Sequence, residues 1–358
     1  MAKSFWEKLA QKTNVHLLSE GLGAGEHTGF IDTGSYALNL LACGSLWDGI
    51  PNNSFVCLAG ETSTGKTYFT LGIIKNFLNA HPDAGVFYHD TEAAVRLKMA
   101  ENRDIDAERI QIFGPKSIES FRTKTIEQIV KYQELCKEVG ETPPFMMVLD
   151  SLGNLSSEKE LEDTAAFGDT KTAEKQRNTK DMTKAGLLKG SFRVLRQTMG
   201  ELKIPMIITN HIYANIGGYG PQKIMSGGSG PSYVADTIWF LTKSKAREGD
   251  DSDGEIIGSK ITVTANKSRE GRENAQVQVL LNHNTGLDRY YGLLDIALEA
   301  GVFKQLAKGI ELPGGIKVAR KEILRNPTEI YTQEILQAIN DATQAQSMFL
   351  YGTGTEVA

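Results

Sequence analysis

One stretch of the sequence, 55–78, constrains the fold more than any other. It reads FVCLAGETSTGKTYFTLGIIKNFL, which is an apolar run of strand length, a glycine-bounded loop and a helical segment. Within it, Gly60 to Thr67 match G-x-x-x-x-G-K-T, the pattern of a phosphate-binding loop. Glycine lets backbone amides approach a phosphate closely, and the following helix directs its unpaired N–H groups and positive dipole end at the same anion. The stretch therefore predicts a strand–loop–helix unit that binds a nucleoside triphosphate.

The residues of this loop have distinct expected roles. Lys66 is expected to reach the β- and γ-phosphates and so to take part in catalysis, and the Thr67 hydroxyl is expected to hold Mg²⁺. A chance match in a glycine-rich chain is the alternative, but the strand before the loop and the helix after it are the context that the motif requires. The residues predicted to contact the nucleotide here are Gly60, Glu61, Thr62, Ser63, Thr64, Gly65, Lys66, Thr67 and Tyr68.

The composition fits a globular protein of a reducing compartment. The chain has 358 residues, of which 40% are hydrophobic, enough for one large or two medium domains with a buried core. No apolar run approaches the length of a membrane span, and the first residues, MAKSFWEKLAQK, lack the apolar stretch of a signal peptide. The three cysteines have neither paired nor metal-ligand spacing, which predicts reduced thiols and a cytoplasmic protein.

The net charge of −5 argues against a protein that coats DNA with its whole surface. It does not argue against DNA binding through a few local loops, because charges farther from the phosphates than a Debye length of about 8 Å are screened.

Apolar runs of strand length alternate with helical patterns along the chain. Such alternation is typical of βαβ units and of a parallel sheet, whose buried strands read as continuous apolar runs. We therefore predict an α/β fold with a mostly parallel central sheet flanked by helices. Strands are expected at 85–90, 109–113, 145–150 and 204–209, and helices at 36–46, 117–139 and 187–199.

Polar side chains follow several of these predicted strands. Ligands of parallel sheets bind at the carboxyl ends of the strands, so we expect these side chains to lie beside the phosphate-binding loop. Asp150 ends the strand at 145–150 and is expected to hold Mg²⁺ together with the Thr67 hydroxyl.

Glu92 follows the strand at 85–90 and is the candidate for orienting and activating the attacking water, with Asp90 as its rival. His211 follows the strand at 204–209, where a structural role and a role as γ-phosphate sensor are both open.

The N-terminal residues predict a short amphipathic helix, 4–12, followed by a glycine-rich linker at 21–25. Ser4 and Glu7 have the spacing of a capping box, and Phe5, Trp6 and Leu9 form an apolar face. A helix this short is not stable alone, so we expect it to dock either on its own domain or on a neighbouring subunit.

Two polar or glycine-rich segments interrupt the regular pattern. Residues 156–185 are polar and of mixed charge, and predict a solvated helical insertion or a loop. Residues 212–231 carry many glycines with Tyr213 and Tyr219, a composition that suits single-stranded nucleic acid, although a surface loop without function is the alternative. Further along, strands are expected at 237–241, 260–264 and 275–281, and helices at 291–302 and 328–342.

Several blocks of sequence, taken in order, resemble the RecA-type recombinases, and most closely their branch in T-even-like phages. The resemblance covers roughly residues 30–300, and the order and spacing of the blocks are far more specific than the phosphate-binding loop alone. The blocks are GETSTGKT at 60–67, DTE at 90–92, VLDSLGNLSSEKELED from 148, ITNHIY at 208–213, MSGGSGPSYVADTIW at 225–239, NKSR at 266–269 and YYGLLDIALEAG at 290–301.

The resemblance implies a RecA-like ATPase core that uses ATP and Mg²⁺, forms a helical filament on single-stranded DNA, and promotes homologous pairing and strand exchange with duplex DNA. It also implies mediator and single-strand-binding partners, no membrane, and the cytoplasm of a host cell. The implied organisation is an oligomerisation arm and linker at 1–29, the core at 30–290 and a C-terminal region at 291–358. Segments 155–184 and 212–230 match the two DNA-binding loops.

The resemblance also assigns roles to individual residues. Glu92 matches the residue that activates water, and His211 the γ-phosphate sensor, where other members have Gln. Lys267 and Arg269 match basic residues that reach the ATP bound to a neighbouring subunit. Ala265 stands where bacterial members have a further lysine, and the aromatic residue that stacks on adenine is replaced near Met99, which makes Met99 or Arg103 the candidates.

Two other classes of protein share the same core. One is a ring-forming motor ATPase or helicase, and the other is an assembly module in which the nucleotide is bound without being hydrolysed. The glycine-rich segment and the N-terminal arm favour the filament, and Glu92 favours an enzyme.

Overall fold

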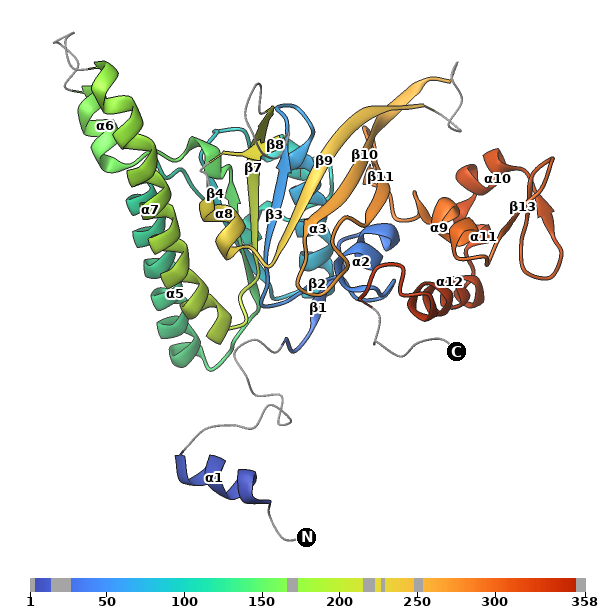
Figure 1. Cartoon of the computed structure of the whole chain (residues 1–358), viewed down its shortest axis with the longest axis horizontal. Coiled ribbons are helices and arrows are strands. Elements are labelled where there is room, and N and C mark those ends of the chain that lie inside the picture. Colours follow the sequence, from blue (N-terminus) through green and yellow to red (C-terminus); the bar gives the residue numbers. More distant parts are fainter. Residues whose placement is uncertain are drawn as a thin grey trace.

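The structure, a computed structural model, describes residues 4–13, 27–165, 173–214, 223–226, 229–247 and 254–351. Its centre is a large sheet with the strand order β12-β11-β10-β9-β3-β7-β6-β4-β5 (Figure 1). The strands from β9 to β5 in this order pair in parallel, and β10, β11 and β12 continue the sheet in antiparallel pairing. The predicted α/β fold with a mostly parallel sheet is confirmed.

The parallel strands follow the apolar runs of the sequence. Their bounds are β3 (Phe55–Gly60), β4 (Gly85–Asp90), β5 (Ile110–Phe113), β6 (Phe145–Asp150), β7 (Met206–Ala214) and β9 (Thr237–Arg247). Every residue of β3 and β6 is buried, as expected for strands covered on both faces. The strands predicted at 85–90 and 145–150 are confirmed with the same bounds.

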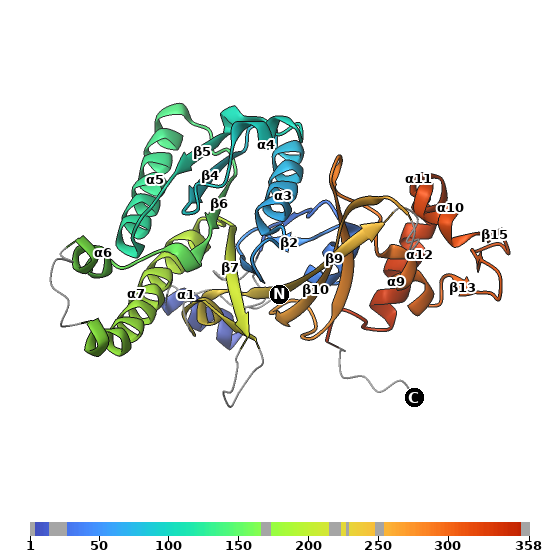
Figure 2. The same ribbon diagram turned by 90° about the horizontal axis from the view of Figure 1, so that it is seen from above.

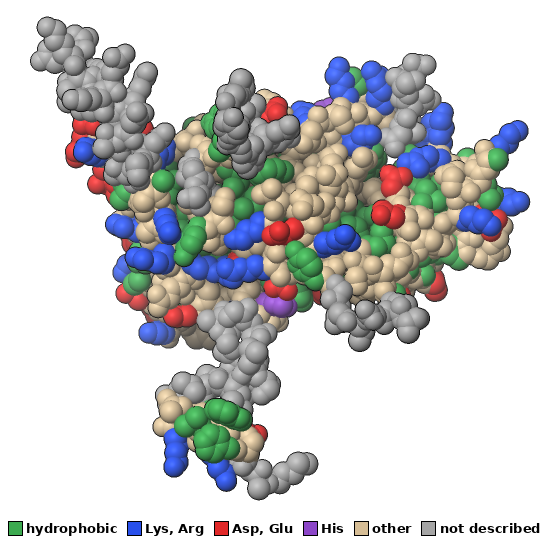
Figure 3. All heavy atoms as spheres, viewed as in Figure 1, with side chains coloured by type: hydrophobic (Ala, Val, Ile, Leu, Met, Phe, Trp, Pro, Cys, Tyr) green, Lys and Arg blue, Asp and Glu red, His purple; other side chains and the backbone are tan. Residues whose placement is uncertain are grey.

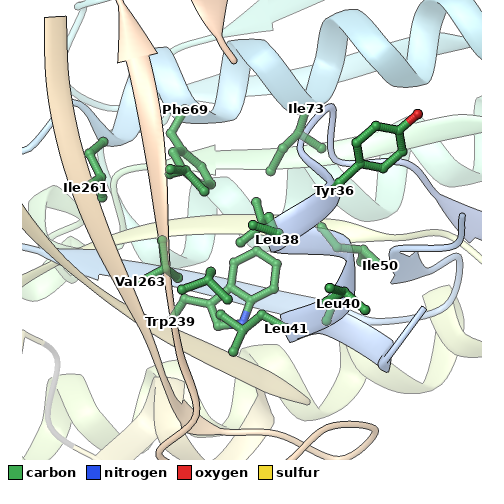
Figure 4. Packing of buried hydrophobic residues seen from close by; sticks show 14 of the residues in the cluster. Tyr36, Leu38, Leu40, Leu41, Ile50, Phe69, Ile73, Trp239, Ile261 and Val263 are labelled. Carbon is green, nitrogen blue, oxygen red and sulfur yellow. The ribbon is translucent and has the colours of Figure 1, made fainter. Parts of the chain in front are cut away.

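Helices cover both faces of the parallel strands (Figures 1 and 2). Successive residues of β3 point to opposite faces, so Cys57 packs toward α5 (Ile118–Val139) and α7 (Ala173–Glu201). Its neighbour Leu58 joins the core formed with α2 (Tyr36–Cys43) and α3 (Lys66–Ala80). This second core continues around Trp239 and Leu38 (Figure 4). The sheet therefore holds α3 in a fixed position at the end of β3.

The remaining elements are the antiparallel strands of the sheet, the short elements around it and the C-terminal region. They are α1 (Phe5–Thr13), β1 (Phe30–Ile31), β2 (Ile50–Pro51), α4 (Leu97–Glu101), α6 (Glu158–Ala165), β8 (Lys223–Met225), α8 (Ser229–Val234), β10 (Ile256–Lys267), β11 (Gln276–Asn282), β12 (Gly286–Leu287), α9 (Leu293–Glu299), β13 (Lys304–Gln305), β14 (Ile310–Glu311), β15 (Lys317–Val318), α10 (Arg320–Arg325), α11 (Pro327–Ile330) and α12 (Gln333–Ala345). Among the described helices, none has both the length and the apolar character needed to cross a membrane.

Several sequence predictions were wrong in their bounds. The helix expected at 187–199 begins at Ala173, because no proline interrupts this charged stretch and a polar helix can lie in solvent. The strand expected at 204–209 continues to Ala214, because β8 pairs with its end, so His211 lies within β7 rather than after it. Part of the loop expected at 212–231 is therefore strand and helix, and residues 215–222 and 227–228 lie outside the described residues.

The helix expected at 328–342 is divided in two. The break falls before Thr332, whose hydroxyl accepts a hydrogen bond from the Ile335 amide and so caps α12. Leu336 and Ile339 of α12 join the same core as α2, and the C-terminal region packs on the rest of the chain through this core (Figure 1).

The N-terminal helix α1 has the predicted capping box. The Ser4 amide donates to the Glu7 carboxylate, and the Glu7 amide donates to the Ser4 hydroxyl at 3.2 Å. Phe5 and Trp6 are 71% and 66% exposed, and this apolar face of α1 is visible in Figure 3. These side chains do not pack on the rest of the described chain. The linker expected at 21–25 lies outside the described residues.

His89 is a buried titratable residue in β4. Its Nε2 lies 3.3 Å from the Thr125 hydroxyl and 3.2 Å from the Met147 sulfur, and its side chain has no exposed surface. Burial disfavours the charged imidazolium and lowers the pKa of His89 to about 4. His89 is therefore neutral in the folded protein at neutral pH.

This burial predicts a loss of stability in mild acid. Because the unfolded pKa is near 6.5 and the folded pKa about 4, the unfolded state takes up a proton first as the pH falls through this window. Urea denaturation between pH 7 and 4 should show that the wild type loses about 3 kcal/mol more unfolding free energy than His89→Gln. Parallel pH profiles for the two proteins would contradict this prediction.

Candidate nucleotide-binding site

The loop between β3 and α3 has the backbone geometry of a phosphate cradle. Gly65, the N-cap residue just before α3, has a φ of +91°, and Ser63 also has a positive φ of 63°. A Cβ at Gly60 would lie 2.6 Å from the Thr64 hydroxyl oxygen, so this position has no space for a side chain. The loop therefore curls over the N-terminus of α3, where unpaired amides and the helix dipole favour an anion.

Lys66 lies folded within this loop. Its Nζ donates to the carbonyl oxygens of Gly60 at 3.0 Å and Glu61 at 2.9 Å, and only 7% of the residue is exposed. Burial lowers the pKa of Lys66, while the negative charges of Glu92 and Asp150 partly oppose this shift. A cation held by two neutral carbonyls is well placed to exchange them for phosphate oxygens.

Glu92 meets residues from two neighbouring strands at the edge of the sheet. The Ser151 hydroxyl donates to Glu92 Oε1 at 2.8 Å, and His211 Nε2 lies 3.0 Å from the same oxygen. Burial raises the pKa of Glu92, but the hydrogen bonds from Ser151 and His211 and the nearby charge of Lys66 outweigh it and hold the pKa below its usual value. Glu92 is thus a fixed carboxylate that is ionised at neutral pH.

Asp90 has a different role from the one expected of a rival base. Its carboxylate accepts hydrogen bonds from the backbone amides of Glu92, Ala94 and Val95 at 3.0–3.2 Å. Asp90 therefore shapes the turn that carries Glu92. The geometry favours Glu92 over Asp90 as the residue that faces a ligand.

Asp150 lies at the end of β6 and accepts hydrogen bonds from three hydroxyl groups. Thr67 and Tyr88 each donate to Oδ2 at 2.7 Å, and Thr209 donates to Oδ1. A hydroxyl and a carboxylate in contact are hard oxygen ligands of the kind that Mg²⁺ takes, usually with one or two carboxylates and the phosphates of the substrate. Thr67 and Asp150 therefore fit a magnesium ion.

A cleft of about 890 Å³ joins these groups. Its lining includes Lys66, Glu92, Asp150 and His211 together with residues of α3 and α4. The predicted site residues that line it are Thr62, Ser63, Gly65, Lys66, Thr67, Tyr68, Glu92, Met99, Arg103, Asp150 and His211.

An aromatic and a cationic side chain in the lining of the cleft contact each other. The Arg103 guanidinium lies 4.4 Å from the centre of the Tyr68 ring, and Met99 also lines the cleft. Both candidates for contact with the base, Met99 and Arg103, thus lie at the cleft.

Other predicted residues lie beside the cleft or away from it. Glu61 and Thr64 line a smaller adjacent cavity, and Gly60 lies beneath them at the end of β3. Lys267 donates to the carbonyls of Ser232 and Ala235, and Arg269 pairs with Asp236 at 3.1 Å.

The register of the sheet separates Lys267 from the phosphate-binding loop. Lys267 pairs with Ile238 and Ile238 with Cys57, whereas Gly60, at the loop, pairs with Leu241 farther along β9. The structure therefore does not bring Lys267 and Arg269 to the cleft of their own chain.

Several residues of the site were missed by sequence reasoning. Tyr88 and Thr209 lie inside apolar strands, on the same face as Asp150, and strand alternation is a signal that could have found them. The Lys243 ammonium donates to the Ser63 carbonyl at 3.0 Å from β9, and no local pattern indicates this contact. The other unpredicted lining residues are Ala94, Arg96, Lys98, Asn102, Ser259, Leu281, Asn282 and His283.

A phosphate-binding loop after a central parallel strand, with carboxylates at the ends of neighbouring strands, defines a P-loop nucleotide-binding protein of the α/β class. No protein-family model matches the chain. The chain is 29% identical over 264 residues to the recombination and repair protein of Enterobacteria phage T4, a match that covers 74% of this chain and 62% of that protein.

Matches to bacterial proteins cover a larger share of the matched protein. The chain is 25% identical over 329 residues to protein RecA of Campylobacter lari, covering 89% of this chain and 86% of that protein. It is 26% identical over 275 residues to protein RecA of Thermotoga maritima, covering 76% and 68%. Together with the fold and the cleft, these matches show that the chain is similar to RecA-type recombinases.

Proposed function

We propose that the protein is an ATP- and single-stranded-DNA-dependent homologous recombinase, which forms a helical filament and promotes pairing and strand exchange in recombination, repair and recombination-dependent replication. The observation that carries the proposal is the Glu92 carboxylate, held by Ser151 and His211 within a P-loop cleft. The names of the relatives, a recombination and repair protein and RecA proteins, support the choice of substrate and reaction.

In the proposed mechanism, Glu92 orients the attacking water and accepts its proton. Lys66 exchanges its carbonyl partners for the β- and γ-phosphates and neutralises charge there. Thr67 and Asp150 hold Mg²⁺, which supplies further neutralisation of phosphate charge when bound.

His211 connects this chemistry to the proposed DNA-binding segment. It hydrogen-bonds Glu92 from β7, and the chain after β7 is the second segment that we propose contacts DNA, the first being 155–184. A movement of β7 on binding DNA would change the contact between His211 and Glu92. Hydrolysis would then depend on DNA.

Lys267 and Arg269 are proposed to act on the nucleotide of a neighbouring subunit. Both lie away from the cleft of their own chain, and the Arg269 side chain is 59% exposed although it pairs with Asp236. When one subunit supplies cations to the phosphoryl-transfer site of the next, ATP hydrolysis depends on the assembly of the subunits. This proposal favours the filament over a module that binds ATP without hydrolysis.

The broader organisation follows the same proposal. Residues 1–29 would form an oligomerisation arm, 30–290 the ATPase core and 291–358 a C-terminal region. Mediator and single-strand-binding proteins would be its partners, and the host cytoplasm its compartment. A ring-forming motor ATPase or helicase remains the second candidate, because it shares the P-loop core.

The first prediction from the proposed function concerns the proposed catalytic carboxylate, Glu92. Glu92→Gln should bind ATP normally but lower kcat by about 100-fold or more, because the amide cannot accept the proton of water. Lys66→Ala should abolish nucleotide binding or turnover, and Glu108→Gln, an exposed surface change, serves as the control. Steady-state phosphate release and nucleotide titration measure these effects. Full hydrolysis by Glu92→Gln would contradict the role of Glu92 and return Asp90 to consideration.

The second prediction concerns DNA. Adding single-stranded DNA should raise the ATPase rate by about 10-fold or more, because the trans cations reach the cleft only in the assembled filament. Negative-stain images with single-stranded DNA and a non-hydrolysable ATP analogue should show helical filaments. Closed rings would support the motor ATPase, and equal rates with and without DNA would count against the recombinase.

The third prediction concerns the exposed face of α1. Phe5→Ala combined with Trp6→Ala, or deletion of residues 1–20, should prevent filaments and lower DNA-stimulated ATPase by about 10-fold, because an interface loses its central apolar anchors. Thermal unfolding of the core should not change. Ile316→Ala, at another exposed apolar residue, is the control. Filaments of normal length from the truncated chain would refute the docking role.

A further inference from the structure

The Asp150 carboxylate is almost entirely buried, and hydroxyl groups satisfy it. The residue is 2% exposed, and its three donors come from three different elements: Thr67 from α3, Tyr88 from β4 and Thr209 from β7. A buried carboxylate is costly unless its oxygens are hydrogen-bonded, and hydrogen bonds to a charged acceptor are strong and directional. These contacts therefore determine how the carboxylate is oriented.

The three donors differ in their access to the cleft. Thr67 and Asp150 line the cleft, whereas Tyr88 and Thr209 are 1% and 0% exposed and are not among the lining residues. The strands that carry Tyr88 and Thr209 flank β6 on its two sides. The buried hydroxyls thus hold the carboxylate from within the sheet, and the contact with Thr67 lies on the open side.

This arrangement has a consequence for a bound cation. Thr67 and Asp150 would hold a magnesium ion in place of their direct contact, and Asp150 would keep its hydrogen bonds from Tyr88 and Thr209. Hydrogen bonds to a metal-binding carboxylate orient it, and loss of such a partner typically costs 10- to 100-fold in metal affinity or activity.

We propose that Tyr88 and Thr209 are positioning residues that fix the Asp150 carboxylate for the metal–nucleotide complex. The proposal rests on the proposed function, because it assumes that the cleft binds nucleotide with a divalent cation. Neither residue touches the nucleotide or the reacting atoms, and each acts through Asp150. Their hydroxyl groups are the parts that matter: a Phe ring or a Val side chain of nearly the same shape lacks the donor.

The test measures metal binding directly rather than turnover alone. Mn²⁺ replaces Mg²⁺ as a paramagnetic probe, and its binding to the protein–ADP complex is followed by electron paramagnetic resonance. Tyr88→Phe and Thr209→Val should each weaken Mn²⁺ binding by about 10-fold or more. ADP affinity measured in EDTA should not change, and Thr209→Ser, which keeps the hydroxyl, should bind Mn²⁺ like the wild type.

Two matched controls remove similar buried or half-buried hydroxyls elsewhere. Tyr132→Phe loses a hydrogen bond to the Pro143 carbonyl at 2.8 Å, and Thr125→Val loses one to the Phe121 carbonyl at 2.9 Å. Both should bind Mn²⁺ and ADP like the wild type. Circular dichroism melts establish that each variant is folded. If Tyr88→Phe does not fold, the comparison of Thr209→Val with Thr209→Ser still tests whether the hydroxyl group is needed for Mn²⁺ binding.

The outcomes separate the two proposals. Wild-type Mn²⁺ affinity in both Tyr88→Phe and Thr209→Val would overturn the positioning role and leave the proposed function intact. Equal weakening in Thr209→Ser and Thr209→Val would also overturn it, because the hydroxyl would then be irrelevant. A wild-type chain that binds no ADP with Mn²⁺ would refute both this inference and the proposed function.

Discussion

Parallel pairing of β3 with β7, of β7 with β6 and of β6 with β4 is the interaction on which the site depends. Because these strands run in one direction, their carboxyl ends meet at one edge of the sheet. Thr67 and Asp150 are 83 positions apart in the sequence, yet their side chains lie 2.7 Å apart. The helices on the two faces bury the apolar side chains that hold the strands in this register.

The same edge explains why the carboxylates of the site differ in role. Asp90 accepts hydrogen bonds from the amides of its own turn, and Asp150 accepts them from hydroxyl groups of three elements. Glu92 contacts the side chains of Ser151 and His211. Each contact follows from the strand on which the residue lies and from the face to which it points. The pKa of Glu92 is below its usual value, so its carboxylate is already ionised without a bound ligand. It can therefore accept a proton from water without first losing one.

Much of this could be predicted from the sequence. The strands at 85–90 and 145–150 were found because strands buried on both faces read as unbroken apolar runs. Glu92, Asp150 and His211 were placed at one edge because parallel topology leaves few alternatives. Tyr88 and Thr209 were missed because they are single polar residues within those runs, and their partner Asp150 is distant in sequence. The early start of α7 was missed because a charged helix in solvent carries no apolar pattern.

The positions of Lys267 and Arg269 suggest that the cleft of one chain is an incomplete site. These cations lie at the opposite end of the sheet strands from the phosphate-binding loop, beside Asp236 and the end of α8. In the account proposed for this protein, assembly on DNA brings them to the cleft of the next subunit. The nucleotide then lies between two copies, and its hydrolysis reports whether both are in place.

Mixing two defective chains tests this claim most directly. The Glu92→Gln variant has a defective cleft but keeps Lys267 and Arg269, the cations proposed to act on the neighbouring subunit. The Lys267→Ala/Arg269→Ala double variant has an intact cleft but lacks these cations. Each alone should be nearly inactive on single-stranded DNA, and an equal mixture should recover about a quarter of the wild-type ATPase rate, because random assembly makes about that share of complete interfaces. A mixture no more active than the sum of its parts would contradict the account.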